Sequence, residues 1–159
     1  MNNITDNCWI YFDSNTIKYY TSIEDFEGAF GFIYKIQHKE SKRYYIGKKV
    51  LQNNITKKLT KKQLAEQSGR GRKPTTEVIQ KESNWKNYWG SSKDFLEYIK
   101  KEGEDKFERK ILYVVPTKKL LTYYEIKAQM ENNCLENPLC YCDNINGKFF
   151  RKDFLVPIE

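Results

Sequence analysis

The sequence predicts an α+β fold, in which a small, mostly antiparallel sheet is flanked by helices and preceded by a β-rich extension. Residues 31–36 and 44–49 are rich in aromatic and β-branched side chains, and a polar stretch of hairpin length joins them, which is typical of two antiparallel strands. A helical segment, an apolar strand and a second helical segment follow. The 159 residues are enough for one core of this kind with an ordered appendage.

The N-terminal extension comprises residues 1–30. Within it, residues 9–12 and 17–20 are typical of two short strands around a turn at Asp13. We expect a hairpin packed beside the main sheet. Because the extension contains more acidic than basic residues, DNA contact there is disfavoured.

The two central strands each carry a tyrosine, Tyr34 and Tyr45, eleven positions apart. Side chains alternate along each strand and pair across neighbouring strands, so both phenols can lie on one face of the sheet. Taken alone, such a pair is more often sheet packing than a catalytic device. A functional interpretation therefore needs support from residues further along the chain.

A long polar insertion, residues 51–81, comes after these strands. Arg70, Arg72 and Lys73 lie among glycines in its second half. A segment of this length is either a disordered tether or functional, and we expect it to be mobile without nucleic acid. These three cations are the candidates for a clamp that closes on the substrate.

Residues 82–92 interleave aromatic side chains with a lysine and hydroxyl groups. Ser91 and Asp94 fit a capping box at the start of a helix that continues to about residue 102. Gly103 is the residue expected to end this helix.

The last third of the chain predicts three further elements. Residues 107–115 are an apolar strand that ends before a proline. Residues 120–132 have helical apolar spacing without Gly or Pro, and Glu125 falls in the middle. A helical Glu is usually a solvated surface residue, so its functional interpretation needs independent support. Residues 141–150 indicate a turn and strand around Asn146 and Gly147.

Positive charge is concentrated in the centre of the chain. The net charge is +7, and residues 42–101 hold sixteen Lys or Arg against five Asp or Glu. This asymmetry indicates a surface for a polyanion, although solvated lysines alone are the simpler alternative. The expected nucleic-acid contacts are Lys48, Lys49, Arg70, Lys73, Trp85, Lys86, Tyr88, Ser91 and Asn144.

The run Phe32-Ile33-Tyr34, together with Tyr45-Ile46-Gly47 on the next strand, resembles the signature of the GIY-YIG nucleases. The order of elements and the Glu on the last helix are also similar to that family over residues 31–150, which leaves 151–159 as a tail. The runs around Lys48 and around Trp85 look like those of phage-encoded homing-type endonucleases.

The resemblance implies an endonuclease that hydrolyses DNA phosphodiester bonds with one divalent cation, Mg²⁺ or Mn²⁺. Glu125 would be the carboxylate ligand of the cation. Tyr34 and Tyr45 would flank the scissile phosphate. A phenol titrates near ~10, so it is a poor base at neutral pH unless neighbouring cations favour the phenolate.

The family's Arg, which normally comes soon after the second tyrosine strand, is missing after Lys49. Arg72 is therefore the expected catalytic cation, supplied by the insertion together with Arg70. The family's Asn near the last strand aligns with Cys142 or with Asn144, and Asn144 is our candidate. A His of some members aligns with Gly90, which leaves Tyr88 as a replacement.

Composition also predicts a compartment. No apolar run approaches the ~20 residues that cross a bilayer, and residues 1–6 lack the layout of a signal peptide. We therefore expect a cytoplasmic protein, in the host cytoplasm if phage-encoded. The four cysteines are expected to be reduced thiols, and a zinc site is not expected because the one His, His38, is far from them in sequence.

Two alternatives to the nuclease remain. The scaffold can serve as a catalytically inactive nucleic-acid-binding module, or Trp85, Tyr88 and Trp89 can form a patch that docks a partner. Both tyrosines and Glu125 favour the enzyme, because a binding module needs none of them. The missing Arg and Asn favour the alternatives. A homodimer on the substrate is a further expectation.

Overall fold

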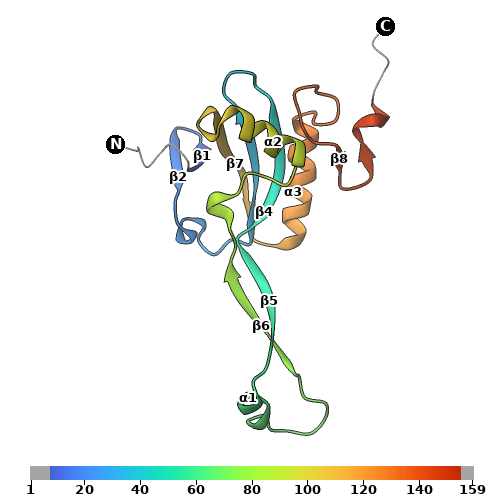
Figure 1. Cartoon of the computed structure of the whole chain (residues 1–159). Helices are drawn as coiled ribbons and strands as arrows, with labels where there is room; N and C mark the ends of the chain where they lie inside the picture. The colour runs from blue at the N-terminus through green and yellow to red at the C-terminus, as the bar shows by residue number, and fades with distance from the viewer. Residues whose placement is uncertain (1–7, 155–159) are drawn as a thin grey trace.

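The computed structural model describes residues 8–154, so the expectation for residues 1–6 and the end of the expected tail lie outside the described part. A five-stranded sheet in the order β2-β1-β7-β3-β4 forms the centre of the domain (Figure 1). Its pairs are antiparallel except β1 with β7, which confirms the predicted mostly antiparallel α+β fold. The strands are β1 (Trp9–Asp13), β2 (Thr16–Tyr20), β3 (Gly31–His38), β4 (Tyr44–Val50) and β7 (Phe107–Val115).

The N-terminal hairpin is part of this sheet. Strand β1 pairs in parallel with β7, with Trp9 opposite Arg109. The indole of Trp9 is buried in the core, and its Nε1 donates a hydrogen bond to the Trp85 carbonyl oxygen at 2.8 Å. The expected hairpin is therefore present, but its strands are hydrogen-bonded into the main sheet, with β1 paired to β7 and β2 as the outermost strand.

Two α-helices pack on the domain, α2 (Lys93–Glu102) and α3 (Lys118–Glu131). Helix α2 begins one residue later than expected, because Ser92 caps it by accepting a hydrogen bond from the Phe95 amide, while Ser91 bonds to Tyr45. Gly103 ends the helix as expected. Within residues 8–154, no helix combines the length and the apolarity that a membrane crossing requires. The 3₁₀ turns are η1 (Ile23–Phe26), η2 (Trp85–Asn87), η3 (Glu104–Lys106) and η4 (Arg151–Asp153).

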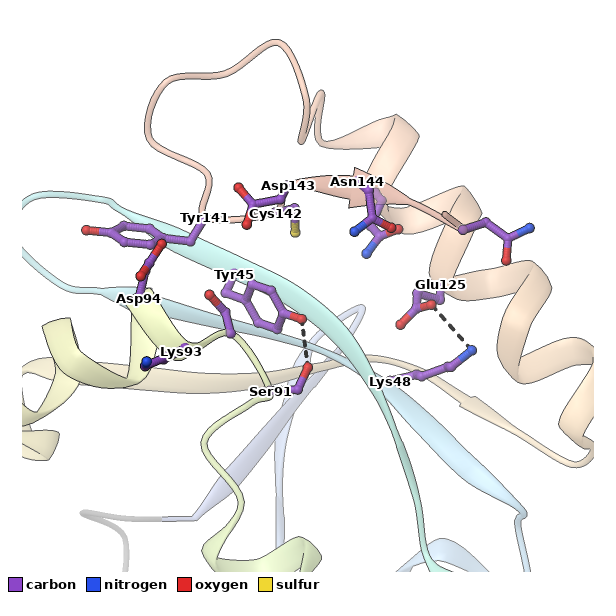
Figure 2. A pocket seen from close by; sticks show the side chains of 13 residues that line it. Tyr45, Lys48, Ser91, Lys93, Asp94, Glu125, Tyr141, Cys142, Asp143 and Asn144 are labelled. Atoms are coloured by element: carbon purple, nitrogen blue, oxygen red, sulfur yellow. Dashed lines mark hydrogen bonds and ion pairs between the residues drawn. The ribbon is translucent and has the colours of Figure 1, made fainter. Parts of the chain in front are cut away.

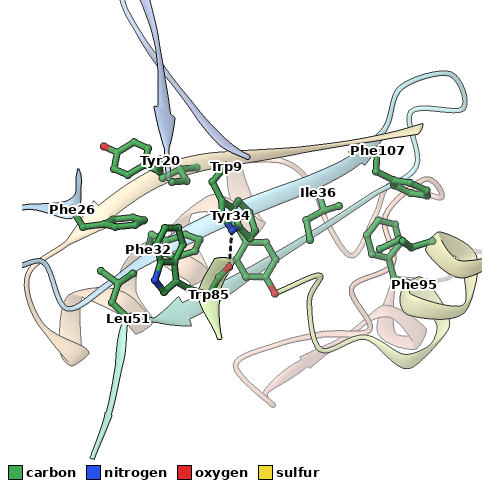
Figure 3. Packing of buried hydrophobic residues seen from close by; sticks show 12 residues of the cluster. Trp9, Tyr20, Phe26, Phe32, Tyr34, Ile36, Leu51, Trp85, Phe95 and Phe107 are labelled. Carbon is green, nitrogen blue, oxygen red and sulfur yellow. Dashed lines mark hydrogen bonds between the residues drawn. The ribbon is translucent and has the colours of Figure 1, made fainter. Parts of the chain in front are cut away.

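Both faces of the sheet are covered, which explains why β3 is buried or half-buried along its whole length. On one face, an aromatic cluster that includes Trp9, Tyr34 and Trp85 packs with Phe95 of α2 (Figure 3). On the other face, Ile33 and the other buried side chains of that side pack against α3. Strand β4 is an edge strand of the sheet, and within the described residues only its first residue, Tyr44, pairs with the returning chain, at Cys140.

The insertion is an ordered antiparallel ribbon that projects away from the domain (Figure 1). Its strands are β5 (Gln52–Lys58) and β6 (Thr76–Glu82), and the short helix α1 (Lys61–Ala65) lies at its far end. The insertion thus has regular secondary structure, which the sequence analysis did not predict. Nearly every ribbon residue is exposed, so the apolar alternation that reveals a half-buried strand is missing from the sequence.

A small hairpin of β8 (Asn144–Ile145) and β9 (Phe149–Phe150) follows α3 near the end of the described residues. Asn146 and Gly147 connect them with φ of 52° and 63°, the positive values that a tight hairpin turn requires. Arg151 comes next and donates hydrogen bonds to four carbonyl oxygens of residues 134–142, at 2.5–3.1 Å. The first residue of the expected tail is thus fixed to the domain.

Candidate active site

A cleft of about 480 Å³ opens beside the edge strand β4, between the start of α2 and the middle of α3 (Figure 2). The third wall is the segment that leads into β8. Most of the residues that line the cleft are polar or charged. The lining residues are Tyr45, Lys48, Ser91, Ser92, Lys93, Asp94, Glu125, Gln129, Tyr141, Cys142, Asp143, Asn144 and Asn146.

The two tyrosines lie on the same face of the sheet, as the spacing indicates. Tyr34 pairs with Gly47 across the β3–β4 ladder, and Tyr45 is two residues before Gly47. The ring centroids are 6.2 Å apart. A Cβ at Gly47 would lie 2.5 Å from the Tyr34 hydroxyl oxygen, so only glycine at this position leaves room for the phenol.

The two phenols differ in their access to the cleft. Tyr45 lines it, and its hydroxyl lies 3.0 Å from the Ser91 Oγ. Tyr34 is 0% exposed, and its ring packs on Trp9 and Tyr88 at centroid distances of 5.3 and 5.7 Å. Tyr45 is therefore the phenol that a bound substrate can reach, and Tyr34 lies behind it.

Burial raises the pKa of both phenols. The pKa of Tyr45 rises to about 12, although the hydrogen bond with Ser91 lowers it. The pKa of Tyr34 is raised well above its usual value, first by burial and then by Tyr88 and Tyr45. Both groups are protonated at neutral pH, so in this state they donate hydrogen bonds and do not act as bases.

Lys48 and Lys49, the cations that follow Tyr45 on β4, are engaged elsewhere. The Lys48 Nζ lies 3.5 Å from the Glu125 Oε1. The Lys49 Nζ donates to the Asn84 Oδ1 at 2.7 Å and lies 4.0 Å from the Tyr88 ring centroid. Neither lysine is a cause of the pKa shift of Tyr45.

Glu125 points into the cleft from the middle of α3 (Figure 2). Its side chain is 17% exposed, and the pKa of its carboxyl group is raised by burial, against the ammonium of Lys48, which lowers it. Lys48 also contacts the Thr122 Oγ1 at 3.3 Å. Glu125 is therefore a shielded carboxylate whose charge is balanced by one lysine, unlike a solvated helix residue.

We predict that Lys48→Met raises the pKa of Glu125 further, because the ammonium that opposes desolvation is removed. The protonated fraction of Glu125 at a given mildly acidic pH then increases. Carbon NMR of the labelled carboxyl groups, recorded across a pH titration of the metal-free protein, measures the shift. Lys49→Met is the matched control, because Lys49 contacts Asn84 and Tyr88, and an equal shift in that variant would contradict the assignment.

Asn144 lines the cleft on β8, but its Oδ1 accepts a hydrogen bond from the Gly147 amide at 3.0 Å and so also holds the hairpin turn. Cys142, the other position aligned with the family's Asn, is buried and also lines the cleft. Sequence reasoning missed the carboxylates of Asp94 and Asp143 as cleft residues. Asp94 was assigned only to helix capping, and residue 143 was passed over in the search for an amide.

The structure does not bring Arg70, Arg72 and Lys73 to the cleft. They lie after α1 at the far end of the ribbon, beyond its last pair, Lys58 with Thr76. Six residue steps separate that pair from the base of the ribbon, or about 20 Å. The expectation that Arg72 supplies the catalytic cation is therefore unsupported, because a paired ribbon holds the arginine away from Glu125.

The aromatic segment after the ribbon is largely core. Trp85 is 0% exposed and its Nε1 donates to the Glu82 Oε1 at 2.8 Å, so it is unavailable for base stacking or for docking a partner. Tyr88 is half-buried against Tyr34, and Lys86 is exposed. Among the predicted contacts in this segment, Ser91 is the one that lines the cleft.

Arg109 is a buried positioning residue that sequence reasoning missed. It is 3% exposed, lies between the rings of Trp9 and Trp89 at 4.6 and 4.5 Å, and donates to the carbonyl oxygens of Lys86 and Tyr88 at 2.9 and 3.0 Å. Burial lowers its pKa to about 10, so it stays cationic at neutral pH. Its place on the buried side of the predicted strand 107–115 was the available signal.

The sheet with two tyrosines on neighbouring strands, and the shielded carboxylate that a packed helix presents at the cleft, fit the nuclease domain that the sequence resembles. The chain belongs to the GIY-YIG family, since the family model described as "Putative endonuclease segE, GIY-YIG domain" matches residues 9–145. The matched range begins at β1 and so includes the N-terminal hairpin. No curated protein and no solved structure matches the chain.

Proposed function

We propose that this protein is a divalent-metal-dependent endonuclease that hydrolyses phosphodiester bonds of DNA. The observation that carries the proposal is the meeting of Tyr45 and Glu125 at one polar cleft on the open edge of the sheet. A phenol donor and a shielded carboxylate, placed on different elements, can act together on one phosphate.

The donor set of the cleft suits Mg²⁺ or Mn²⁺. Glu125 offers a hard oxygen ligand, and the side chains of Asp143 and Asn144 line the same cleft. One or two carboxylates, with water and substrate phosphate oxygens, are the usual ligands of Mg²⁺. When bound, the cation would stabilise charge on the phosphate and lower the pKa of a water ligand.

Residues of the chain can hold the substrate phosphate in position. Tyr45, protonated at neutral pH, can donate a hydrogen bond to a phosphate oxygen, and Tyr34 supports its ring from behind. The N-terminus of α2 opens at the cleft with Lys93, and the free amide groups of a helix start favour a phosphate. These contacts orient the substrate without any Arg at the cleft.

The ribbon is the proposed DNA-binding arm. Residues 51–81 contain eight Lys or Arg against two Glu, and nearly all residues of this segment are exposed. A two-stranded ribbon fits the major groove of B-DNA, where it can contact phosphates on both sides. The hydroxyl of Ser83 bonds to the Val50 carbonyl oxygen at 2.6 Å and fixes the base of the ribbon to β4, beside the cleft.

We expect the double variant Arg70→Ala/Arg72→Ala to weaken DNA binding while turnover at saturating DNA stays near the wild-type value. Each lost phosphate contact lowers the slope of log K against log salt by about 0.9. Binding titrations at several salt concentrations, together with single-turnover cleavage, measure both quantities. Lys100→Ala/Lys101→Ala, at the end of α2 remote from the cleft, removes the same charge and is the control. Lost turnover with unchanged binding would restore a catalytic role for an arginine.

A plasmid-nicking assay tests the proposed function. Supercoiled DNA should be cut in the presence of Mg²⁺ or Mn²⁺ and remain intact in excess chelator. The second candidate is a nucleic-acid-binding module without activity, which is favoured by the position of Arg72 far from the cleft. Tight DNA binding without cutting under any divalent metal would support that candidate and overturn the nuclease.

The proposal extends to the type of enzyme, its compartment and the number of copies that act on one DNA site. We infer a phage or mobile-element type of enzyme that acts in the cytoplasm, which is the host's if the gene is phage-encoded. A second copy on the same DNA would provide the second cut of a double-strand break. Size-exclusion chromatography with light scattering, with and without a DNA duplex, measures the copy number.

A further inference from the structure

Three cysteine side chains meet beneath the wall of the cleft that leads into β8. The sulfur atoms of Cys134, Cys140 and Cys142 all lie within 4.8 Å of one another. All three residues are buried, with exposures of 0%, 5% and 2%. They lie on the α3 side of the sheet, where the Cys142 Sγ is 3.4 Å from the Ile46 carbonyl oxygen of β4.

The end of α3 explains how Cys134 reaches this cluster. Asn133 has a φ of +50°, and the amides of Asn133 and Cys134 donate to the carbonyl oxygens of Met130 and Gln129 at 3.1 and 3.0 Å. This is a Schellman motif, in which the residue after the left-handed position turns back beneath the helix. Cys134 is the residue that follows the left-handed Asn133, so its side chain lies at this turn.

The other two cysteines come from the segment that returns to the sheet. The main chain of Cys140 forms an isolated β-bridge with that of Tyr44 at the start of β4. The Cys142 amide donates a hydrogen bond to the Cys140 Sγ at 3.4 Å. An amide hydrogen bond of this kind stabilises a thiolate. Local spacing thus brings Cys140 and Cys142 together, and the helix end adds the third sulfur.

We propose that Cys134, Cys140 and Cys142 bind one thiophilic divalent cation, Zn²⁺, as a structural site. Thiolates are the ligands that Zn²⁺ prefers, and Zn–S distances of about 2.3 Å in a tetrahedral site place the sulfur atoms about 3.8 Å apart. The observed cluster needs only small movements to reach that spacing. This proposal departs from the sequence-based expectation of no zinc site, which considered only a His as the partner of the cysteines.

Among residues 8–154, no His, Asp or Glu side chain joins the three sulfur atoms. The fourth ligand is therefore a water molecule or a backbone oxygen such as that of Ile46. Positive charge is close, because the Arg151 guanidinium donates hydrogen bonds to the carbonyl oxygens of all three cysteines, and the Lys35 ammonium interacts electrostatically with Cys134 and Cys140. These cations balance the negative charge that three thiolates leave on a divalent ion.

The site has a structural consequence for the cleft. Cys142 lines the cleft and directly precedes Asp143 and Asn144, which also line it. A cation that joins Cys142 to the end of α3 would fix this wall relative to Glu125. The metal site itself does not depend on the proposed nuclease activity, because its evidence is the cluster alone.

The test uses the full chain, purified under reducing conditions. Elemental analysis after dialysis should give about one Zn per chain, and Co²⁺ added to the stripped protein should give the near-ultraviolet absorption of a cobalt–thiolate bond. Zn²⁺ should raise the melting temperature of the stripped protein. Cys142→Ser should lose the cobalt–thiolate absorption or reduce it strongly. Cys8→Ser, which removes the cysteine outside the cluster, should keep all three results.

The wild-type measurements decide the proposal even if Cys142→Ser fails to fold. No bound metal and no cobalt–thiolate absorption at a small excess of Co²⁺ would overturn it. A disulfide between two of the three cysteines in freshly reduced and refolded protein, found by mass spectrometry, would overturn it as well. Equal metal binding by Cys142→Ser and wild type would place the ion elsewhere.

Discussion

Glu125→Gln is expected to abolish detectable metal-dependent DNA cleavage. The substitution removes the shielded carboxylate of the cleft and keeps the shape of the side chain. A bound cation contributes several kcal/mol to stabilising the transition state, and each ~1.4 kcal/mol is a factor of ten in rate. We therefore expect the rate to fall by at least about 10³, measured in a single-turnover cleavage assay with saturating DNA and Mg²⁺.

Folding should survive this change. The pKa of Glu125 is raised by burial, so a neutral amide at this position avoids the cost of desolvating the charge. Lys48 loses its partner, but its side chain is 40% exposed and can turn to solvent. Glu131→Gln on the same helix is the control, since its side chain is 50% exposed in an exposed pair with Lys127. Full activity of Glu125→Gln, with unchanged melting, would remove Glu125 from the mechanism.

Tyr45→Phe is expected to lower the cleavage rate by ~10²–10³, the range typical for the loss of one hydrogen-bond donor positioned against developing charge. The hydroxyl is the part of Tyr45 that can reach a phosphate in the cleft, and it is also the partner of Ser91. The ring packs against Phe95 at a centroid distance of 5.9 Å, and phenylalanine keeps that contact. Melting temperature and DNA affinity should change little.

Tyr34→Phe is the comparison that separates packing from chemistry. The Tyr34 hydroxyl is buried behind Tyr45, so in this state its loss should reduce the rate less than the loss of the Tyr45 hydroxyl. The cleavage rates of both variants at saturating DNA show which hydroxyl contributes more to the reaction, and melting curves show whether either variant is destabilised. Wild-type cutting by Tyr45→Phe would leave the cleft tyrosine with a packing role only. An equal loss in both variants would mean that DNA binding exposes Tyr34.

Local patterns in the sequence determined the parts of the molecule that short-range chemistry controls. The alternation along residues 31–36 and 44–49 placed both tyrosines on one face, as observed. Capping residues revealed α2, and apolar side chains revealed β7 and α3. Asn146 with Gly147 revealed the last turn. The resemblance singled out Glu125, whose place on the helix alone indicated a solvated residue.

The tertiary structure decided the features that depend on contacts between distant segments. The parallel pairing of β1 with β7 and the burial of Arg109 between two tryptophans bring together residues as far as 100 positions apart. The ribbon is held by main-chain pairing, which leaves little trace in an exposed polar sequence, and this pairing keeps Arg72 from the cleft. The three cysteines meet because the end of α3 and a returning segment converge beneath β4, a convergence that no spacing in the sequence records.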